Sequence, residues 1–376
     1  MLAKIAMILG SLVLSLLAAE ALVGFIDPQV SRRPRVWQFD EQLGWAHVPS
    51  SGGTFVAPEF EVDIRINAEG LRDRDYERAK APGTRRLLAF GDSFIEGWGV
   101  EVEESVSKRL EARLQEKAGG PIEVINFGVA GYGTDQELLF FEKTGRHYGP
   151  DRVLVFFYGN DLWNNALPNG IGSERGYKPV FRPGPGGRLQ LNGVPVRKHP
   201  FWDRHKRELP WDARLQRYLG DHWHLYLLAR KALSEPPART THGEFYGAIY
   251  GPASEPRWER LWDLSGRILA AFDERVKSAG AELTVVYIPA IVQIEAEDWR
   301  MKREMYDLVG DFDLQMPNRR LRYLADVHGF DLVDLYDPFV AAAAEGTLYF
   351  RDSHWNPAGH DLAAAVLADS LAARGL

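Results

Sequence analysis

The sequence predicts an α/β fold of three layers, in which helices cover both faces of a parallel sheet of about five strands. Short apolar runs alternate along the chain with longer segments of helical periodicity, as they do when parallel strands are joined through helices. Hydrophobic residues make up 45% of the 376-residue chain, which is ample for a substantial core. We therefore expect a large globular α/β protein.

Five apolar runs are the predicted strands, at residues 87–90, 122–125, 153–157, 283–288 and 331–335. A helix is expected from about Glu103, after the first strand. Its apolar stripe is Val106, Leu110 and Leu114. Residues 134–137, Thr-Asp-Gln-Glu, form a capping box that opens the next helix. A helix over residues 258–279 ends at Gly280 and leads to the fourth strand.

The N-terminal segment carries a localisation signal. Residues 5–26 are mostly apolar, with Glu20 as the one charged residue, and about 20 such residues suffice to cross a bilayer core. We predict a signal-anchor at residues 1–26. A cleaved signal peptide is the alternative, because residues 19–21 have the Ala-x-Ala form of a cleavage site. Lys4 precedes the segment and three arginines follow it, a charge balance that opposes export.

Residues 27–84 are predicted to be an extended leader that packs on the core. Within it, residues 60–66 alternate apolar and charged side chains, which is typical of a half-buried strand. The core domain is assigned to residues 85–376.

A long insertion, residues 162–256, interrupts the core after the third strand. It contains a strand-like run at 189–191 followed by Asn-Gly, which is a hairpin turn signal, and a helical run at 211–233. A connection of this length is usually functional, so we interpret it as a lid or a substrate-recognition element. A decorative or oligomer-forming insert is the alternative.

Two short motifs supply a serine, a base and a carboxylate. A Gly-Asp-Ser motif ending at Ser93 follows the first strand, and Asp352-Ser353-His354 precedes an Asn-Pro pair that predicts a helix start. Both motifs fall on loops where strand gives way to helix, the edge at which ligand chemistry gathers in open α/β sheets. Ser93, His354 and Asp352 are the groups that acyl transfer requires.

Two further residues end predicted strands in a similar way. Gly131 closes the run that follows the second strand, and Asn160 follows the third. A glycine lets backbone N–H groups approach a substrate closely, and an asparagine amide is a neutral donor suited to a developing oxyanion.

The four segments around Ser93, Gly131, Asn160 and His354, called blocks below, occur in the order typical of the SGNH (GDSL-type) esterase and lipase family. The chain resembles this family over roughly residues 85 to 370, apart from the insertion. The resemblance implies a flavodoxin-like α/β/α fold without a cofactor. It also implies that Ser93 is the nucleophile and that its own N–H lies in the oxyanion hole. Gly131 and Asn160 would supply the other two donors, and His354 would be the base, oriented by Asp352.

The chain departs from the family pattern at two places. Arg351 stands where the commoner pattern has its aspartate, and Asp352 lies two residues before His354. This D-x-H spacing is similar to that of alginate-type O-acetyltransferases. In the third block, Tyr158 replaces the usual glycine two residues before Asn160.

The expected function is that of a serine esterase that forms an acyl-enzyme on an O-acyl group of a carbohydrate or lipid. One alternative is an O-acetyltransferase that modifies an envelope polysaccharide, and another is a non-catalytic envelope assembly or glycan-binding module. The resemblance to membrane-anchored members implies an extracytoplasmic domain, periplasmic or at the cell surface. Secretion after signal cleavage is the alternative location.

Other acid–histidine pairs are weaker candidates. Asp203 with His205 and Asp326 with His328 share the D-x-H spacing, but His328 precedes its strand and should lie at the opposite edge of the sheet from Ser93. An H-x-H pair, His222 and His224, lacks a third metal ligand, so no metal site is predicted. His360, in the first turn of the last predicted helix, is expected to pack or cap.

Charge and cysteine content narrow the function classes. A net charge of −7, without a sustained Lys/Arg cluster, argues against nucleic acid as a partner. Zero cysteines exclude disulfides, a lipobox anchor and a thiol nucleophile.

Overall fold

The computed structural model of the chain describes residues 1–118, 120–169, 176–206, 210–233, 239–251 and 255–375. The chain forms two compact units, and each is described by itself. The larger unit holds residues 36–51, 65–203 and 238–376, and the smaller one holds residues 1–35, 52–64 and 204–237.

The larger unit is built on a five-stranded parallel sheet in the order β11-β10-β7-β5-β6. Its strands are β5 (Arg85–Gly91), β6 (Ile122–Gly128), β7 (Arg152–Phe157), β10 (Glu282–Tyr287) and β11 (Asp331–Asp334). The central strand β7 is buried along its whole length, as expected for a parallel strand covered on both faces. The predicted parallel sheet of about five strands is confirmed.

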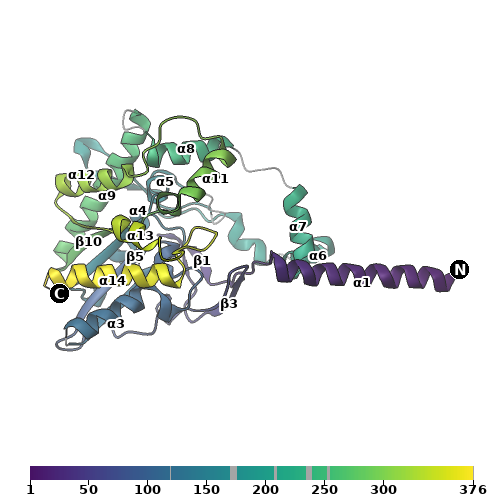
Figure 1. Ribbon diagram of the computed structural model, residues 1–376. Helices are drawn as coiled ribbons and strands as arrows, with labels where there is room; N and C mark the ends of the chain where they lie inside the picture. The colour runs from purple at the N-terminus through teal and green to yellow at the C-terminus, as the bar shows by residue number, and fades with distance from the viewer. Residues whose placement is uncertain (119, 170–175, 207–209, 234–238, 252–254, 376) are drawn as a thin grey trace. The chain divides into compact units, whose positions relative to one another are not determined.

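Helices cover both faces of this sheet (Figure 1). On one face, α3 (Val106–Ala118) packs against α14 (Pro357–Ala373), and the predicted stripe of α3 is fully buried. The other face carries α4 (Thr134–Lys143), α9 (Pro256–Ser278) and α12 (Met316–His328). The result is the predicted three-layer α/β/α arrangement.

Shorter elements complete the larger unit. They are β1 (Trp37–Asp40), β2 (Gly44–His47), α2 (Ser93–Glu96), α5 (Asp161–Ala166), β8 (Val180–Pro183), β9 (Leu189–Asn192), α8 (Arg239–Tyr250), α10 (Ile291–Ile294), α11 (Ala296–Tyr306), α13 (Tyr336–Ala342) and 3₁₀ turns at Val102–Glu104, Gly145–Tyr148, Pro185–Gly187 and Pro200–Lys206. The prediction of a hairpin turn at Asn192-Gly193 is wrong, because β9 pairs with the preceding strand β8 through residues 184–188.

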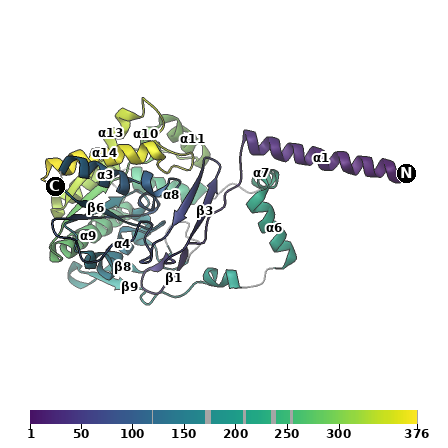
Figure 2. The same ribbon diagram turned by 90° about the horizontal axis from the view of Figure 1, so that it is seen from below.

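The smaller unit contains α1 (Leu2–Ile26), the paired strands β3 (Gly52–Ala57) and β4 (Phe60–Arg65), α6 (Trp211–His222) and α7 (His224–Leu233). The alternating segment forms β4, with its apolar side chains turned to the buried side as predicted. The single helical run expected at 211–233 is two helices, divided at Trp223. Figures 1 and 2 both show α7 beside the C-terminal end of α1.

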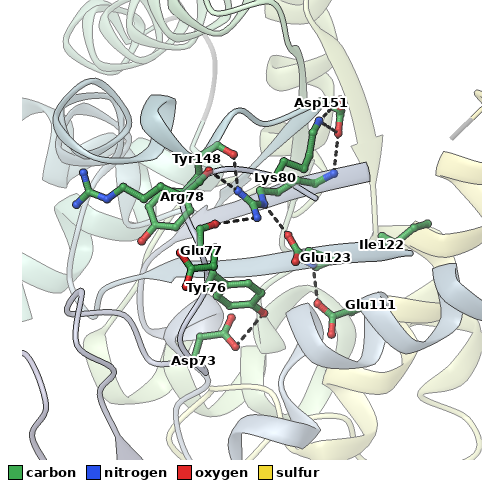
Figure 3. Close-up of polar contacts among 12 residues, drawn as sticks. Asp73, Tyr76, Glu77, Arg78, Lys80, Glu111, Ile122, Glu123, Tyr148 and Asp151 are labelled. Carbon is green, nitrogen blue, oxygen red and sulfur yellow. Dashed lines mark hydrogen bonds and ion pairs between the residues drawn. The ribbon is translucent and has the colours of Figure 1, made fainter. Parts of the chain in front are cut away.

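A buried arginine fixes the segment before β5 to the sheet. Arg86 is 1% exposed, its Nε lies 2.6 Å from Glu123 Oε2, and its two terminal nitrogens donate to three backbone carbonyls. Those carbonyls belong to Glu77, Arg78 and Tyr148, three of the residues labelled in Figure 3. A buried guanidinium needs most of its donors paired, so this network sets the path of the chain into the sheet.

Candidate active site

The structure brings Ser93, His354 and Asp352 together. Ser93 Oγ lies 2.8 Å from His354 Nε2 although the two residues are 261 positions apart. On the other side of the imidazole, Nδ1 lies 3.1 Å from Asp352 Oδ1, a close contact that does not meet hydrogen-bond geometry. The same oxygen accepts the backbone N–H of His354, also at 3.1 Å. Serine, imidazole and carboxylate thus form one chain of contacts.

The end of β5 and the start of α2 present Ser93. Asp92 is the N-cap of α2, and its Oδ1 accepts the Phe94 N–H at 3.0 Å. The short helix lies directly over β6, because a Cβ added at Gly128 would be 2.1 Å from the backbone nitrogen of Glu96. Glycine at 128 therefore lets the helix settle close to the sheet edge.

His354 sits on the loop that enters α14. The helix begins as predicted, with Asn356 as N-cap accepting the Gly359 N–H at 3.1 Å and proline in the first turn. Ser353, between the acid and the base, has a φ of +75°, so the backbone turns sharply there.

Trp98, which no sequence motif indicated, is a neighbour of this chain of contacts. Its Nε1 donates to Asp352 Oδ2 at 2.7 Å, and its ring is stacked on the His354 imidazole with 4.9 Å between centroids. Burial would raise the pKa of the Asp352 carboxyl, but the contacts with His354 and the Trp98 hydrogen bond lower it overall. Asp352 is therefore ionised at neutral pH.

The two predicted oxyanion donors follow β6 and β7, the strands on either side of β5. Asn160 Nδ2 donates one hydrogen to Asp92 Oδ2 at 2.8 Å, which leaves its second hydrogen for another acceptor. Gly131 has a φ of +79°, a conformation that favours glycine. Within the part of the chain that the structure describes, neither the Ser93 N–H nor the Gly131 N–H donates to a protein acceptor.

Buried side chains hold the Gly131 loop in place. Trp45, on β2, donates its indole N–H to the carbonyl of Ala130 at 3.1 Å, and Tyr132 OH donates back to the Trp45 carbonyl. Glu96 accepts the Ala130 N–H. Both backbone polar groups of Ala130, the residue before Gly131, are thus fixed by buried side chains. The sequence offered no motif for this role, since Trp45 is 85 positions from Ala130.

Two carboxyl groups, those of Asp161 and Glu137, are buried in the segments that follow the predicted oxyanion donors. Asp161 accepts the N–H groups of Thr134 and Tyr158, at 3.1 and 2.8 Å. Burial, followed by the charge of neighbouring carboxylates, raises the pKa of both Asp161 and Glu137 well above the usual range. The prediction that Thr134 and Glu137 form a capping box is wrong. Gly133 is the N-cap, and both Glu137 oxygens are buried without a hydrogen-bond partner among the described residues.

The rival histidines have other surroundings. His328 ends α12, before β11, and His222 Nδ1 contacts the Tyr218 carbonyl. His224 Nδ1 accepts the Gln29 N–H at 2.8 Å. Burial lowers the pKa of His360 to about 3, and its Nδ1 accepts the Val106 N–H.

The acids paired with these histidines by spacing also lie elsewhere. Asp203 pairs with Lys198, whereas the side chain of His205 is outside those described. Asp326 lies on α12. Over the described ranges, no group of three or more His, Cys, Asp or Glu side chains is arranged to hold a metal ion.

Comparison with known proteins identifies the family. Residues 89–362 match the model of the GDSL-like Lipase/Acylhydrolase family. The chain belongs to this family. Membership confirms the resemblance to GDSL-type enzymes and places the chain among serine esterases.

Several solved structures are similar at low identity. The acetyl xylan esterase AlAXEase is 14% identical with a TM-score of 0.41, covering 76% of this chain and 99% of that one. LAE5, an alpha/beta hydrolase enzyme from the metagenome of Lake Arreo, Spain, is 14% identical with a TM-score of 0.40, covering 78% and 97%. Axe2, an acetylxylan esterase from Geobacillus stearothermophilus, is 13% identical with a TM-score of 0.40, covering 76% and 94%. No curated protein sequence matches the chain significantly.

Proposed function

We propose that this GDSL-family chain cleaves esters through an acyl-enzyme on Ser93. The observation that carries the proposal is the 2.8 Å contact between Ser93 Oγ and His354 Nε2, at the edge of the sheet where β5 ends. A hydroxyl is a weak nucleophile until a base takes its proton, and this distance suits that transfer.

In the proposed reaction, His354 Nε2 takes the Ser93 proton as Oγ attacks the ester carbonyl carbon. The carbonyl oxygen becomes an oxyanion and accepts hydrogen bonds from the Ser93 N–H, the Gly131 N–H and Asn160 Nδ2. When the C–O bond breaks, the alcohol leaves with the proton from His354. Water then attacks the acyl-enzyme by the same steps and releases the acid.

Asp352 and Trp98 complete the arrangement. An ionised carboxylate beside Nδ1 keeps the proton on that nitrogen and stabilises the imidazolium that forms, and the lowered pKa of Asp352 favours this state. The carboxylate itself is oriented by the Trp98 N–H.

The proposed substrate is an O-acyl group on a carbohydrate or lipid. The D-x-H spacing of Asp352 and His354 favours one second candidate, transfer of the acyl group to a sugar hydroxyl of an envelope polysaccharide. A bound hydroxyl competes with water through its high effective concentration.

One experiment tests the proposal in two stages. Purified protein should be labelled at Ser93 by a fluorophosphonate probe, and Ser93→Ala should abolish both labelling and hydrolysis of p-nitrophenyl acetate. Absence of labelling in a folded wild-type protein would instead favour a non-catalytic assembly or glycan-binding module. Mass spectrometry of products from acetyl donors with oligosaccharides then separates free acetate from acetylated sugar.

We further propose that the N-terminal segment is retained as a signal-anchor of an extracytoplasmic enzyme. The 25-residue helix α1 has no buried residue, and it is long and apolar enough to cross a membrane. Glu20 of this helix accepts the backbone N–H groups of His224 and Leu225, at 2.7 and 2.8 Å, where α7 begins. Cleavage after residue 21 would remove this cap, which supports retention over a cleaved signal peptide.

The proposed domain division keeps residues 27–84 as a leader and residues 85–376 as the catalytic domain, with the insertion at 162–256. Two observations support assigning part of the leader to the catalytic domain in function. Trp45 contacts the Gly131 loop, and the carbonyls of Glu77 and Arg78 accept from Arg86 of β5.

A further inference from the structure

A small cavity lies beside the loops that carry Asn160 and His354. Tyr158 and Gly159, directly before Asn160, line one side, and Ser353, directly before His354, lines another. The cavity volume is about 70 Å³. It therefore adjoins two of the loops from which the proposed reaction draws its groups.

The insertion supplies the opposite wall. Helix α8 contributes Phe245, Tyr246, Ile249 and Tyr250, and the chain after β10 contributes Ala290, Ile291 and Val292. Ile249 is 1% exposed and rests on the Asn160 block, because a Cβ added at Gly159 would be 3.0 Å from Ile249 Cδ1. The position of α8 thus sets the width of the cavity.

The lining suits an apolar group of limited size. Most of the lining side chains are aromatic or aliphatic, with the charged Lys302 as an exception. An engineered cavity of ~150 Å³ accommodates the six carbons of benzene, so 70 Å³ suits a chain of about three carbons.

Tyr158 reduces the space beside Ser93. Its ring packs on Phe94, the residue after the nucleophile, with 4.8 Å between centroids. Phe94 in turn lies 5.2 Å from the His354 ring. Tyrosine at the place where family members usually have glycine therefore fills space close to the serine.

We propose that this cavity holds the acyl chain of the substrate ester and restricts it to about two to four carbons. The proposal rests on the proposed esterase function and adds the identity of the acyl group. In the acyl-enzyme, the carbonyl oxygen faces the three oxyanion donors. The acyl chain leaves the carbonyl carbon in a different direction, toward the space between Gly159, Ser353 and Ile249.

The test measures kcat/KM for p-nitrophenyl esters of two, four, six and eight carbons in the full-length chain. Wild-type protein should prefer acetate and butyrate to octanoate by about tenfold or more, since an acyl chain longer than the cavity clashes with its walls when the carbonyl carbon is at Ser93. Ile249→Ala should widen the cavity and raise the ratio of hexanoate to acetate by about tenfold. Ile249→Phe should lower the ratio of butyrate to acetate.

Ile268→Ala is the matched control. This isoleucine is fully buried on α9 and does not line the cavity, so the chain-length ratios should stay at wild-type values. The acyl-pocket proposal is overturned if wild type hydrolyses octanoate as well as acetate, or if both Ile249 variants keep wild-type ratios. A wild-type protein that neither hydrolyses acetate nor reacts with fluorophosphonate overturns the esterase function itself, which is a different result.

Discussion

Trp98 donates its indole N–H to Asp352 Oδ2 at 2.7 Å while its ring lies on the imidazole of His354 at an interplanar angle of 21°. One side chain therefore contacts both partners of the proposed acid–base pair. An aromatic face within about 6 Å of a cation stabilises it, so the ring favours the imidazolium that forms when His354 takes the serine proton.

Trp98→Phe should lower kcat/KM by roughly tenfold, because the ring remains but the hydrogen bond to a charged carboxylate, of about 1.5 kcal/mol or more, is lost. Trp98→Leu should lower it further, since the imidazolium loses its aromatic neighbour. Steady-state kinetics of the two variants check both effects. Trp258→Phe, a change at a buried tryptophan on α9, should keep the wild-type kcat/KM. Wild-type rates in Trp98→Leu would show that Trp98 only fills space.

Asn160→Ala should lower kcat by about 10²–10³ with a smaller change in KM, the usual cost of one oxyanion donor. The matched control is Asn318→Ala, a change at a buried asparagine on α12, which should cost stability rather than turnover. Steady-state kinetics and melting temperatures of both variants separate the two effects. Equal losses of kcat in the two variants would assign the third donor to another group.

The buried carboxyl of Glu137 should make the protein less stable as pH rises. Burial raises the pKa of Glu137 in the folded state. Above pH 4.5, the ordinary pKa of this carboxyl, the folded protein therefore keeps a proton that the unfolded chain releases. This penalty is absent below pH 4.5 and grows as pH increases toward the folded-state pKa. Glu137→Gln removes the titration, so the melting temperature of the variant should rise relative to wild type between pH 4.5 and 8.

Glu142→Gln, on the same helix but paired with Arg275, serves as the control, and its effect on melting temperature should not grow over this range. A constant difference between Glu137→Gln and wild type at all pH values would mean that Glu137 is ionised in the folded protein.

The mature chain should keep its first 21 residues and fractionate with membranes. Mass spectrometry of the N-terminal peptide from membranes checks this directly, and a chain that begins at residue 22 would contradict the anchor. Glu20→Ala should speed amide exchange in the first turn of α7, because the His224 and Leu225 N–H groups lose their acceptor. Glu41→Ala, in the larger unit, should leave that exchange unchanged.

The sheet and the serine–histidine contact were predictable because they depend on local signals. Each strand is a buried apolar run, and Ser93 and His354 each stand next to a turn or helix cap with a recognisable composition. Parallel strands carry their ends to one edge, so the meeting of distant motifs follows from topology.

Contacts without a local signal were not predictable. Trp98 and Asp352 are 254 positions apart, and nothing in the sequence around Trp98 indicates a hydrogen-bonding role. Glu137 has the spacing of a capping residue, yet tertiary packing places it in the interior and leaves the cap to Gly133. Local patterns describe what a segment favours alone, and packing decides which side of the helix faces the core.

The contact between Trp45 and Ala130 shows that the start of the family match and the start of the residues that support the site differ in this chain. Similarity to the family begins at residue 89, but the side chain that fixes the peptide next to Gly131 lies 44 positions earlier. The residues that match the family thus begin later in the chain than the residues that build the site. A hybrid enzyme joined at the start of the family match would carry every motif residue and still lack the support of its oxyanion loop.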